Sequence, residues 1–171
     1  MLEQAKAVRL MIFDVDGVMT DGRLYYTDAG EELKAFHSLD GHGLKMLQQS
    51  GVKLAIITGR TSNLVAHRAR NLGIEFVHQG AHDKLASFDA LLSEVGVTAS
   101  ECGYMGDDVI DLPVMRRVAF AVSVPDSPAL VRQYAHYVTG SQGGCGAVRE
   151  VCELIMQAQN TLDAAMAPYL R

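Results

Sequence analysis

The stretch LMIFDVDG, residues 10–17, ends an apolar run with two aspartates two positions apart. The run is typical of a strand buried on both faces in the middle of a parallel sheet. Asp14 and Asp16 follow at alternate positions, so their side chains leave the strand on the same side. Two carboxylates this close repel each other unless a cation lies between them or one is protonated. The stretch therefore predicts a strand that ends at a chemical site, with a polar strand end in an ordinary turn as the alternative.

Similar apolar runs recur along the chain and alternate with helical patterns. The predicted strands lie within residues 8–15, 52–58, 74–77, 102–106, 118–122 and 135–139. Amphipathic segments lie between several of them, and Gly51, Gly73 and Gly96 mark the ends of three predicted helices. This order predicts an α/β fold with a doubly wound, Rossmann-like, mostly parallel sheet. Ligands of such folds bind beyond the carboxyl ends of the strands, where Asp14, Thr58 and Asp107 fall.

One segment departs from the alternation. Residues 21–38 contain two short extended patterns around the turn sequence TDAG, which predicts a β-hairpin inserted after the first strand. An isolated hairpin is marginally stable, so its apolar side chains are expected to pack against something: Leu24, Tyr25, Tyr26, Leu33 and Phe36. The 171 residues suit a single domain, 1–171, that ends in a Gly-rich segment and helix over about 140–171.

The composition excludes several classes of function. A net charge of −5 argues against a surface for nucleic acid or an anionic membrane. The N-terminal residues fit neither a signal peptide nor a membrane span, which predicts a cytoplasmic protein. Cys102, Cys145 and Cys152 form no CxxC pair, so they are expected to be reduced thiols without a chemical role.

Three later motifs carry the same kind of chemistry as the aspartate pair. Thr58 in IITGR offers a hydroxyl for a phosphate oxygen, or else caps the next helix. Lys84 lies in a first helical turn, where the helix dipole disfavours a cation; an anionic partner explains it better than a solvated surface. The segment MGDDVIDLPVM adds three acids that suit a hard cation such as Mg²⁺, or that cap helices: Asp107, Asp108 and Asp111.

These four signals, taken in order, resemble the motifs of the haloacid dehalogenase superfamily of phosphohydrolases over nearly the whole chain. The resemblance implies that Asp14 is the nucleophile and forms an aspartyl-phosphate. Asp16 is then the acid that protonates the leaving oxygen and the base that activates water. Thr58 and Lys84 hold the oxygens of the phosphoryl group. Phosphate ester hydrolysis is the reaction that follows.

The same resemblance implies a magnesium cofactor. Its ligands are the Asp14 carboxylate, the Asp16 backbone carbonyl and Asp107. Asp108 and Asp111 support them.

Two other classes compete with an enzyme of this superfamily. Response-regulator receiver domains also combine acids, a Thr and a Lys, but their phosphoacceptor Asp ends a later strand, and the strand before Thr58 offers none. A catalytically silent binding domain of the same fold is the second alternative. The presence of Asp14, Asp16, Lys84 and Asp107 argues against it.

The spacing of the motifs leaves no room for a cap domain. Asp14 and Thr58 are 44 positions apart, and Thr58 and Lys84 are 26 apart. A site without a cap is open to water and to large substrates unless a neighbouring subunit covers it, and the apolar hairpin is the element expected to do so.

Four segments of the sequence resemble one family without a cap domain, the 3-deoxy-D-manno-octulosonate 8-phosphate phosphatases. Members of this family act in lipopolysaccharide sugar biosynthesis as homotetramers. The similar segments are residues 21–47, 57–60, 106–115 and 143–155. The resemblance implies that the sugar acid contacts a set of residues beside Asp16 and Lys84: His37, Ser38, Leu39, Asp40, Gly41, Lys45, Gly59, Arg60 and Arg68. Arginines suit a substrate that carries a carboxylate as well as a phosphate.

Two points stay open at the level of sequence. A related sugar-acid phosphate, such as a nonulosonate 9-phosphate, is the alternative substrate. Cys145 stands where related chains often have a basic residue, which puts an anion contact of the C-terminal segment in doubt.

Overall fold

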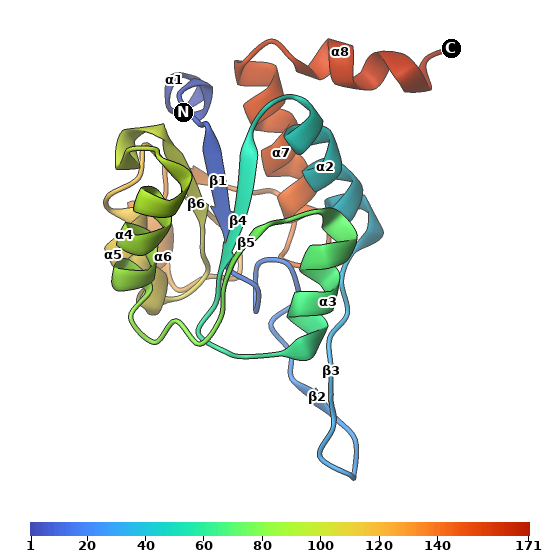
Figure 1. The fold of residues 1–171 in the computed structure, drawn as a ribbon, viewed down its shortest axis with the longest axis vertical. Helices are drawn as coiled ribbons and strands as arrows, with labels where there is room; N and C mark the ends of the chain where they lie inside the picture. The colour runs from blue at the N-terminus through green and yellow to red at the C-terminus, as the bar shows by residue number, and fades with distance from the viewer.

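A computed structural model describes residues 1–171 and contains a six-stranded parallel sheet in the order β5-β4-β1-β6-β7-β8 (Figure 1). The strands are β1 Leu10–Phe13, β4 Lys53–Ile57, β5 Phe76–His78, β6 Cys102–Met105, β7 Phe120–Ser123 and β8 Tyr137–Val138. Every predicted apolar run overlaps one of these strands, and the α/β prediction is confirmed. β1 lies between β4 and β6, so its carboxyl end opens onto the middle of the sheet edge.

Helices cover both faces of the sheet (Figure 1). One layer holds α1 Leu2–Lys6, α2 Ser38–Gln49, α3 Asn63–Leu72 and α7 Ala147–Ala158; the other holds α4 Lys84–Val95, α5 Leu112–Met115 and α6 Ala129–Tyr134. Successive side chains of β1 point to opposite faces of the sheet, so the strand contributes to both layers. Met11 and Phe13 pack against the first layer of helices, and Leu10 and Ile12 pack against the second. All four side chains are fully buried, which accounts for the continuous apolar run.

The helix ends agree in part with the sequence. Gly73 and Gly96 follow α3 and α4 in the left-handed conformation, with φ of 71° and 75°, as their C-terminal positions predict. The C-terminal region contains α7, α8 Leu162–Met166 and the 3₁₀ helix η3 Ala167–Tyr169, whereas a single helix was expected. Two further 3₁₀ turns are η1 Ala99–Glu101 and η2 Val109–Asp111.

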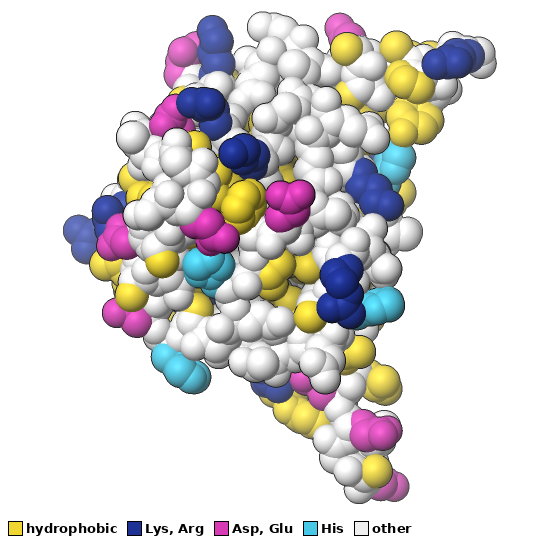
Figure 2. Space-filling view, in the orientation of Figure 1, with side chains coloured by type: hydrophobic (Ala, Val, Ile, Leu, Met, Phe, Trp, Pro, Cys, Tyr) yellow, Lys and Arg dark blue, Asp and Glu magenta, His cyan; other side chains and the backbone are white.

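The predicted hairpin is confirmed as a separate two-stranded antiparallel sheet of β2 Tyr25–Tyr26 and β3 Glu32–Leu33. It projects from the body of the molecule, and hydrophobic side chains lie along it (Figure 2). Phe36 packs against the core as expected. The other apolar side chains have no cover within the same chain, since Leu24, Tyr25, Tyr26 and Leu33 are 39–57% exposed.

The Gly-rich segment before α7 supports the loop that follows β1. The Gly144 amide donates to the Val18 carbonyl at 3.0 Å. Gly144 has a φ of +64°, and a Cβ built there would overlap the backbone of Thr20 and Asp21. The close approach of two backbones thus explains why this segment is rich in glycine.

Two expectations from composition can be compared with the structure. The three cysteines are unpaired, in agreement with reduced thiols. None of the helices combines the length and the apolar character needed to cross a bilayer.

Candidate active site

The carboxyl ends of β1, β4 and β6 meet at an open pocket of about 260 Å³. Its lining is made largely of the residues that the sequence singled out: Asp14, Asp16, Gly22, Thr58, Gly59, Arg60, Lys84, Asp107, Asp108 and Ile110. The parallel sheet therefore gathers side chains that are up to 96 positions apart in the chain, from Asp14 to Ile110.

Asp14 and Lys84 form a buried ion pair at the floor of the pocket. Lys84 Nζ lies 3.0 Å from Asp14 Oδ2, and the two side chains are 2% and 7% exposed. Burial raises the pKa of Asp14 to about 7, with a further contribution from Asp111, while Lys84 opposes the shift. Burial disfavours the charge on Lys84 too, but its attraction to Asp14 and Asp111 prevails and raises its pKa.

Asp111 supports the Asp14–Lys84 pair from the buried side of the pocket. Its Oδ1 accepts from Lys84 Nζ and from the Tyr104 hydroxyl, both at 2.6 Å. Its Oδ2 accepts from the backbone amides of Asp107 and Asp108, both at 3.1 Å. The carboxylate is fully buried and each oxygen already accepts two hydrogen bonds. These contacts suit Asp111 to orienting Lys84 and the loop that carries Asp107.

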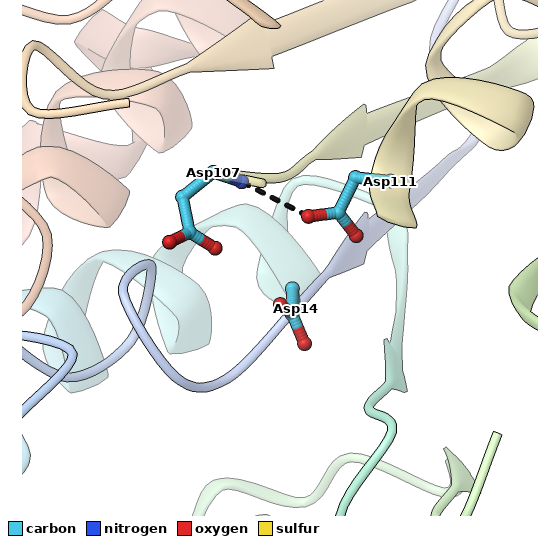
Figure 3. Close-up of side chains that lie close together, drawn as sticks. All are labelled: Asp14, Asp107 and Asp111. Carbon is cyan, nitrogen blue, oxygen red and sulfur yellow. Dashed lines mark hydrogen bonds between the residues drawn. The ribbon is translucent and has the colours of Figure 1, made fainter. Parts of the chain in front are cut away.

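Asp107 lies across from Asp14, and both carboxylates point into the space between the strand ends (Figure 3). Oxygens of Asp14, Asp107 and Asp111 lie within 4.8 Å of one another. Burial raises the pKa of Asp107 to about 7, and the charges of Asp14 and Asp111 add to the shift. A cation between Asp14 and Asp107 would remove this repulsion, and oxygen ligands are those that Mg²⁺ prefers. The residues present therefore fit a magnesium ion.

Gly17 is needed for this geometry. Its φ is +90°, and a Cβ at this position would overlap the Asp107 carboxylate. The loop after β1 can thus approach Asp107 only with glycine at position 17.

Asp16 lies at the mouth of the pocket with its side chain 22% exposed. Its Oδ1 is paired with Lys34 Nζ of the hairpin, and its Oδ2 lies 3.9 Å from Arg60 Nε. Sequence reasoning missed Lys34, because a single lysine beside a short hairpin strand gives no periodic or motif signal. Lys34 lies beside Asp16 only because the chain after the hairpin folds back toward the pocket.

Thr58 is buried at the end of β4 and does not cap α3. Ser62 is the N-cap of that helix, and its hydroxyl accepts from the Leu64 amide at 3.2 Å. The structure thus removes the alternative explanation of Thr58 and leaves its hydroxyl available to an anion in the pocket.

The residues predicted to contact a sugar fall into separate groups. Gly59 and Arg60 line the pocket. His37, Asp40, Gly41 and Arg68 lie together in a second cluster at the start of α2, where Asp40 Oδ1 accepts from the Arg149 amide of α7 at 2.9 Å. Three further residues are exposed on α2 outside the pocket: Ser38, Leu39 and Lys45. Within one chain, only Gly59 and Arg60 of these groups line the same pocket as the predicted catalytic side chains.

The raised pKa values predict how pH affects the metal-free protein. The pKa of Asp14 and of Asp107 is about 7 in the folded state, against an ordinary value of 3.8. Between these values the folded state binds more protons than the unfolded state, so the two groups lower stability as the pH rises.

Mg²⁺ binds the ionised forms of these two carboxyl groups. We expect Mg²⁺ to raise the melting temperature more at pH 8 than at pH 5, as measured by thermal unfolding. An equal rise at both values would contradict this prediction, and Asp107→Asn is the matched variant in which the difference should shrink.

Comparison with known proteins finds similar proteins over nearly the whole chain, although no family model matches it. The 3-deoxy-D-manno-octulosonate 8-phosphate phosphatase of Yersinia pestis is 48% identical over 164 residues, which cover 96% of this chain and 88% of that protein. Among solved structures, a probable YrbI family phosphatase from Pseudomonas syringae has a TM-score of 0.98 at 50% identity, covering 99% of this chain and 97% of that one.

A second solved structure bears on the chemistry. It is the 3-deoxy-D-manno-octulosonate 8-phosphate phosphatase of Moraxella catarrhalis, in complex with a magnesium ion, a phosphate ion and a 3-deoxy-D-manno-octulosonate (KDO) molecule. Its TM-score is 0.96 at 46% identity, covering 98% of this chain and 97% of that one. The shared fold, the sequence identity of 46–48% and the high coverage of both proteins show the family. This chain belongs to the 3-deoxy-D-manno-octulosonate 8-phosphate phosphatase family of the haloacid dehalogenase superfamily.

Proposed function

We propose that this protein is a magnesium-dependent phosphatase that hydrolyses 3-deoxy-D-manno-octulosonate 8-phosphate to the free sugar acid and phosphate. The reaction serves lipopolysaccharide sugar biosynthesis in the cytoplasm. The observation that carries the proposal is the Asp14–Lys84 pair, 3.0 Å apart in a pocket that Asp16, Thr58 and Asp107 also line. The family membership of the chain supports the choice of substrate.

The first half of the reaction transfers the phosphoryl group to the enzyme. An Asp14 carboxylate oxygen attacks phosphorus, and the bond between phosphorus and the sugar oxygen breaks. Asp16, two residues along and at the pocket mouth, gives a proton to that oxygen as it leaves. Lys84 and the Thr58 hydroxyl are within the same pocket and bind the phosphoryl oxygens.

The second half returns the enzyme to its starting state. Asp16 takes a proton from a water molecule, whose oxygen attacks the phosphorus of the aspartyl-phosphate. The bond between phosphorus and Asp14 breaks, and phosphate leaves. The Asp14 and Asp107 carboxylates and the Asp16 carbonyl would hold Mg²⁺, which neutralises charge on the phosphoryl oxygens. Asp111, saturated with hydrogen bonds, keeps Lys84 and the Asp107 loop in place.

A phosphate-release screen with Mg²⁺ tests the substrate. We expect 3-deoxy-D-manno-octulosonate 8-phosphate to have the highest kcat/KM among sugar-acid phosphates, nonulosonate 9-phosphates included. A higher value for a nonulosonate 9-phosphate would replace the proposed substrate while leaving the chemistry intact. Absence of phosphate release from every ester would favour the silent binding domain.

We further infer that the hairpin makes the protein a homotetramer in which neighbouring subunits complete the sites. Leu24, Tyr25, Tyr26 and Leu33 remain exposed on a projecting element. Full burial of such a side chain stabilises by about 1.5–3 kcal/mol, so several hairpins that meet have ample energy to associate. A neighbour would also bring a second set of polar residues to an otherwise open pocket.

Leu33→Asp tests the assembly. Leu33 pairs with Tyr25 across the hairpin, on the face opposite the Tyr26–Glu32 pair that contacts Arg60. The variant is therefore expected to dissociate the tetramer and to lower kcat/KM without changing the Asp14–Lys84 pair. Light scattering and phosphate release measure both effects, with Leu130→Asp on α6 as the control at a similarly exposed leucine. A fully active wild-type monomer would refute the shared site.

A further inference from the structure

Four charged side chains join the hairpin to the pocket in a closed ring of alternating sign. Lys34 Nζ is paired with Asp16 Oδ1 and lies 3.3 Å from Glu32 Oε1. The same Glu32 oxygen accepts from an Arg60 Nη at 2.7 Å. Arg60 Nε lies 3.9 Å from Asp16 Oδ2, which closes the ring. Asp16 comes from the loop after β1, Lys34 and Glu32 from the hairpin, and Arg60 from the loop after β4.

Lys34 is the buried member of this ring. Its side chain is 2% exposed, compared with 22% for Asp16, 18% for Glu32 and 42% for Arg60. A lysine is rarely buried to this extent unless acids surround its ammonium group. Two carboxylates satisfy that condition here, so Lys34 is held in one position rather than free to move in solvent.

The ring also fixes the hairpin against the pocket. An Arg60 Nη donates to the Tyr26 hydroxyl at 3.2 Å in addition to Glu32. Tyr26 and Glu32 are partners across the two strands, so Arg60 binds both strands at one point of the register. The position of the hairpin and the orientation of the Asp16 carboxylate are thereby linked.

We propose that Lys34 is a positioning residue for the general acid and base, and that it transmits the position of the hairpin to Asp16. Each Asp16 oxygen faces a cation from a different segment, which restricts the rotation of the carboxylate. Proton transfer to a leaving oxygen needs that carboxylate within about 2.6–3.2 Å of it, so orientation governs the rate of this step. The proposal concerns the orientation of Asp16 and not its proton affinity. It rests on the proposed function, in which Asp16 protonates the sugar oxygen.

Lys34→Met tests the role with two phosphate esters. The sugar alkoxide of 3-deoxy-D-manno-octulosonate 8-phosphate is a poor leaving group and needs a proton, whereas the phenolate of p-nitrophenyl phosphate leaves without one. We expect kcat for the sugar ester to fall about tenfold to a hundredfold, a partial loss of the roughly 10²–10⁴-fold that general acid catalysis contributes, because Asp16 is still present but misplaced. For p-nitrophenyl phosphate, kcat should fall less than about threefold, because protonation of its leaving group contributes little. Lys53→Met, an exposed lysine at the start of β4, is the control and should change neither rate.

A double mutant separates positioning from a merely structural role. In an Asp16→Asn background, adding Lys34→Met should leave the rate with the sugar ester unchanged, because the acid that Lys34 positions is already absent. Equal losses with both esters, or the same loss with and without Asp16, would overturn the proposal. Lys34→Gln, which keeps a hydrogen-bond donor, replaces Lys34→Met if thermal unfolding shows that the latter does not fold. The wild-type enzyme is assayed alongside, so its failure to hydrolyse the sugar ester would reject the proposed function instead.

Discussion

Asp14→Asn is expected to lower kcat for phosphate ester hydrolysis by about 10⁴-fold or more, as removal of the nucleophile does in enzymes that act through a covalent intermediate. An amide oxygen does not displace the sugar oxygen from phosphorus, and it supplies no negative charge to Mg²⁺. Since Lys84 would keep its bond to Asp111 at 2.6 Å, the pocket should otherwise persist. Phosphate release under saturating substrate measures the loss.

The fold of the Asp14→Asn variant should be at least as stable as the wild type without metal. Burial raises the pKa of the Asp14 carboxyl to about 7, so its ionised form is held at a cost above neutral pH that a neutral amide avoids. Thermal unfolding at pH 8 in a chelator checks this point. Asp89→Asn, at a surface pair with Arg117, is the matched control and should retain full turnover. Turnover by Asp14→Asn within tenfold of the wild type would rule out the covalent mechanism.

Removal of Mg²⁺ has the second largest expected effect. A chelator should abolish hydrolysis, and added Mg²⁺ should restore it, because Asp14 and Asp107 repel each other and the incoming phosphate without a cation between them. Ca²⁺ should fail to restore activity, since it prefers longer bonds and more ligands than an in-line transfer tolerates. Activity assays across a range of Mg²⁺ concentrations give the measurement. Full activity in the chelator would overturn the metal site.

Two acids near this site should respond differently to substitution. Asp107→Asn is expected to raise the Mg²⁺ concentration needed for activity while leaving the fold intact. Asp111→Asn should instead destabilise the protein, because Asp111 is fully buried and accepts hydrogen bonds from Lys84, Tyr104 and two backbone amides. A loss of stability in Asp107→Asn and not in Asp111→Asn would reverse the assignment of ligand and support.

Short-range patterns account for the predictions that the structure confirms. A strand covered on both faces must be apolar at every position, so β1 and its neighbours are visible as runs in the sequence. Helix ends that need a positive φ select glycine, which marks Gly73 and Gly96. Each of these signals depends on a residue and its immediate neighbours alone.

The tertiary structure decided what depends on distant partners. One oxygen of Asp40 accepts from the Arg149 amide, 109 positions away, a contact that no local pattern reveals. Most apolar side chains of the hairpin are exposed in the single chain, because the chain itself offers them no surface.

The sequence by itself determined the α/β sheet and the convergence of Asp14, Thr58, Lys84 and Asp107 at one edge of it. It could do so because parallel strands bring their carboxyl ends together whatever their order. The order of the strands, the four hydrogen bonds that hold Asp111, and the pairing of Lys34 with Asp16 came only from the tertiary structure. Hydrogen bonds and ion pairs act over a few ångströms, so a charged residue in a loop acquires its role only when folding chooses its neighbours.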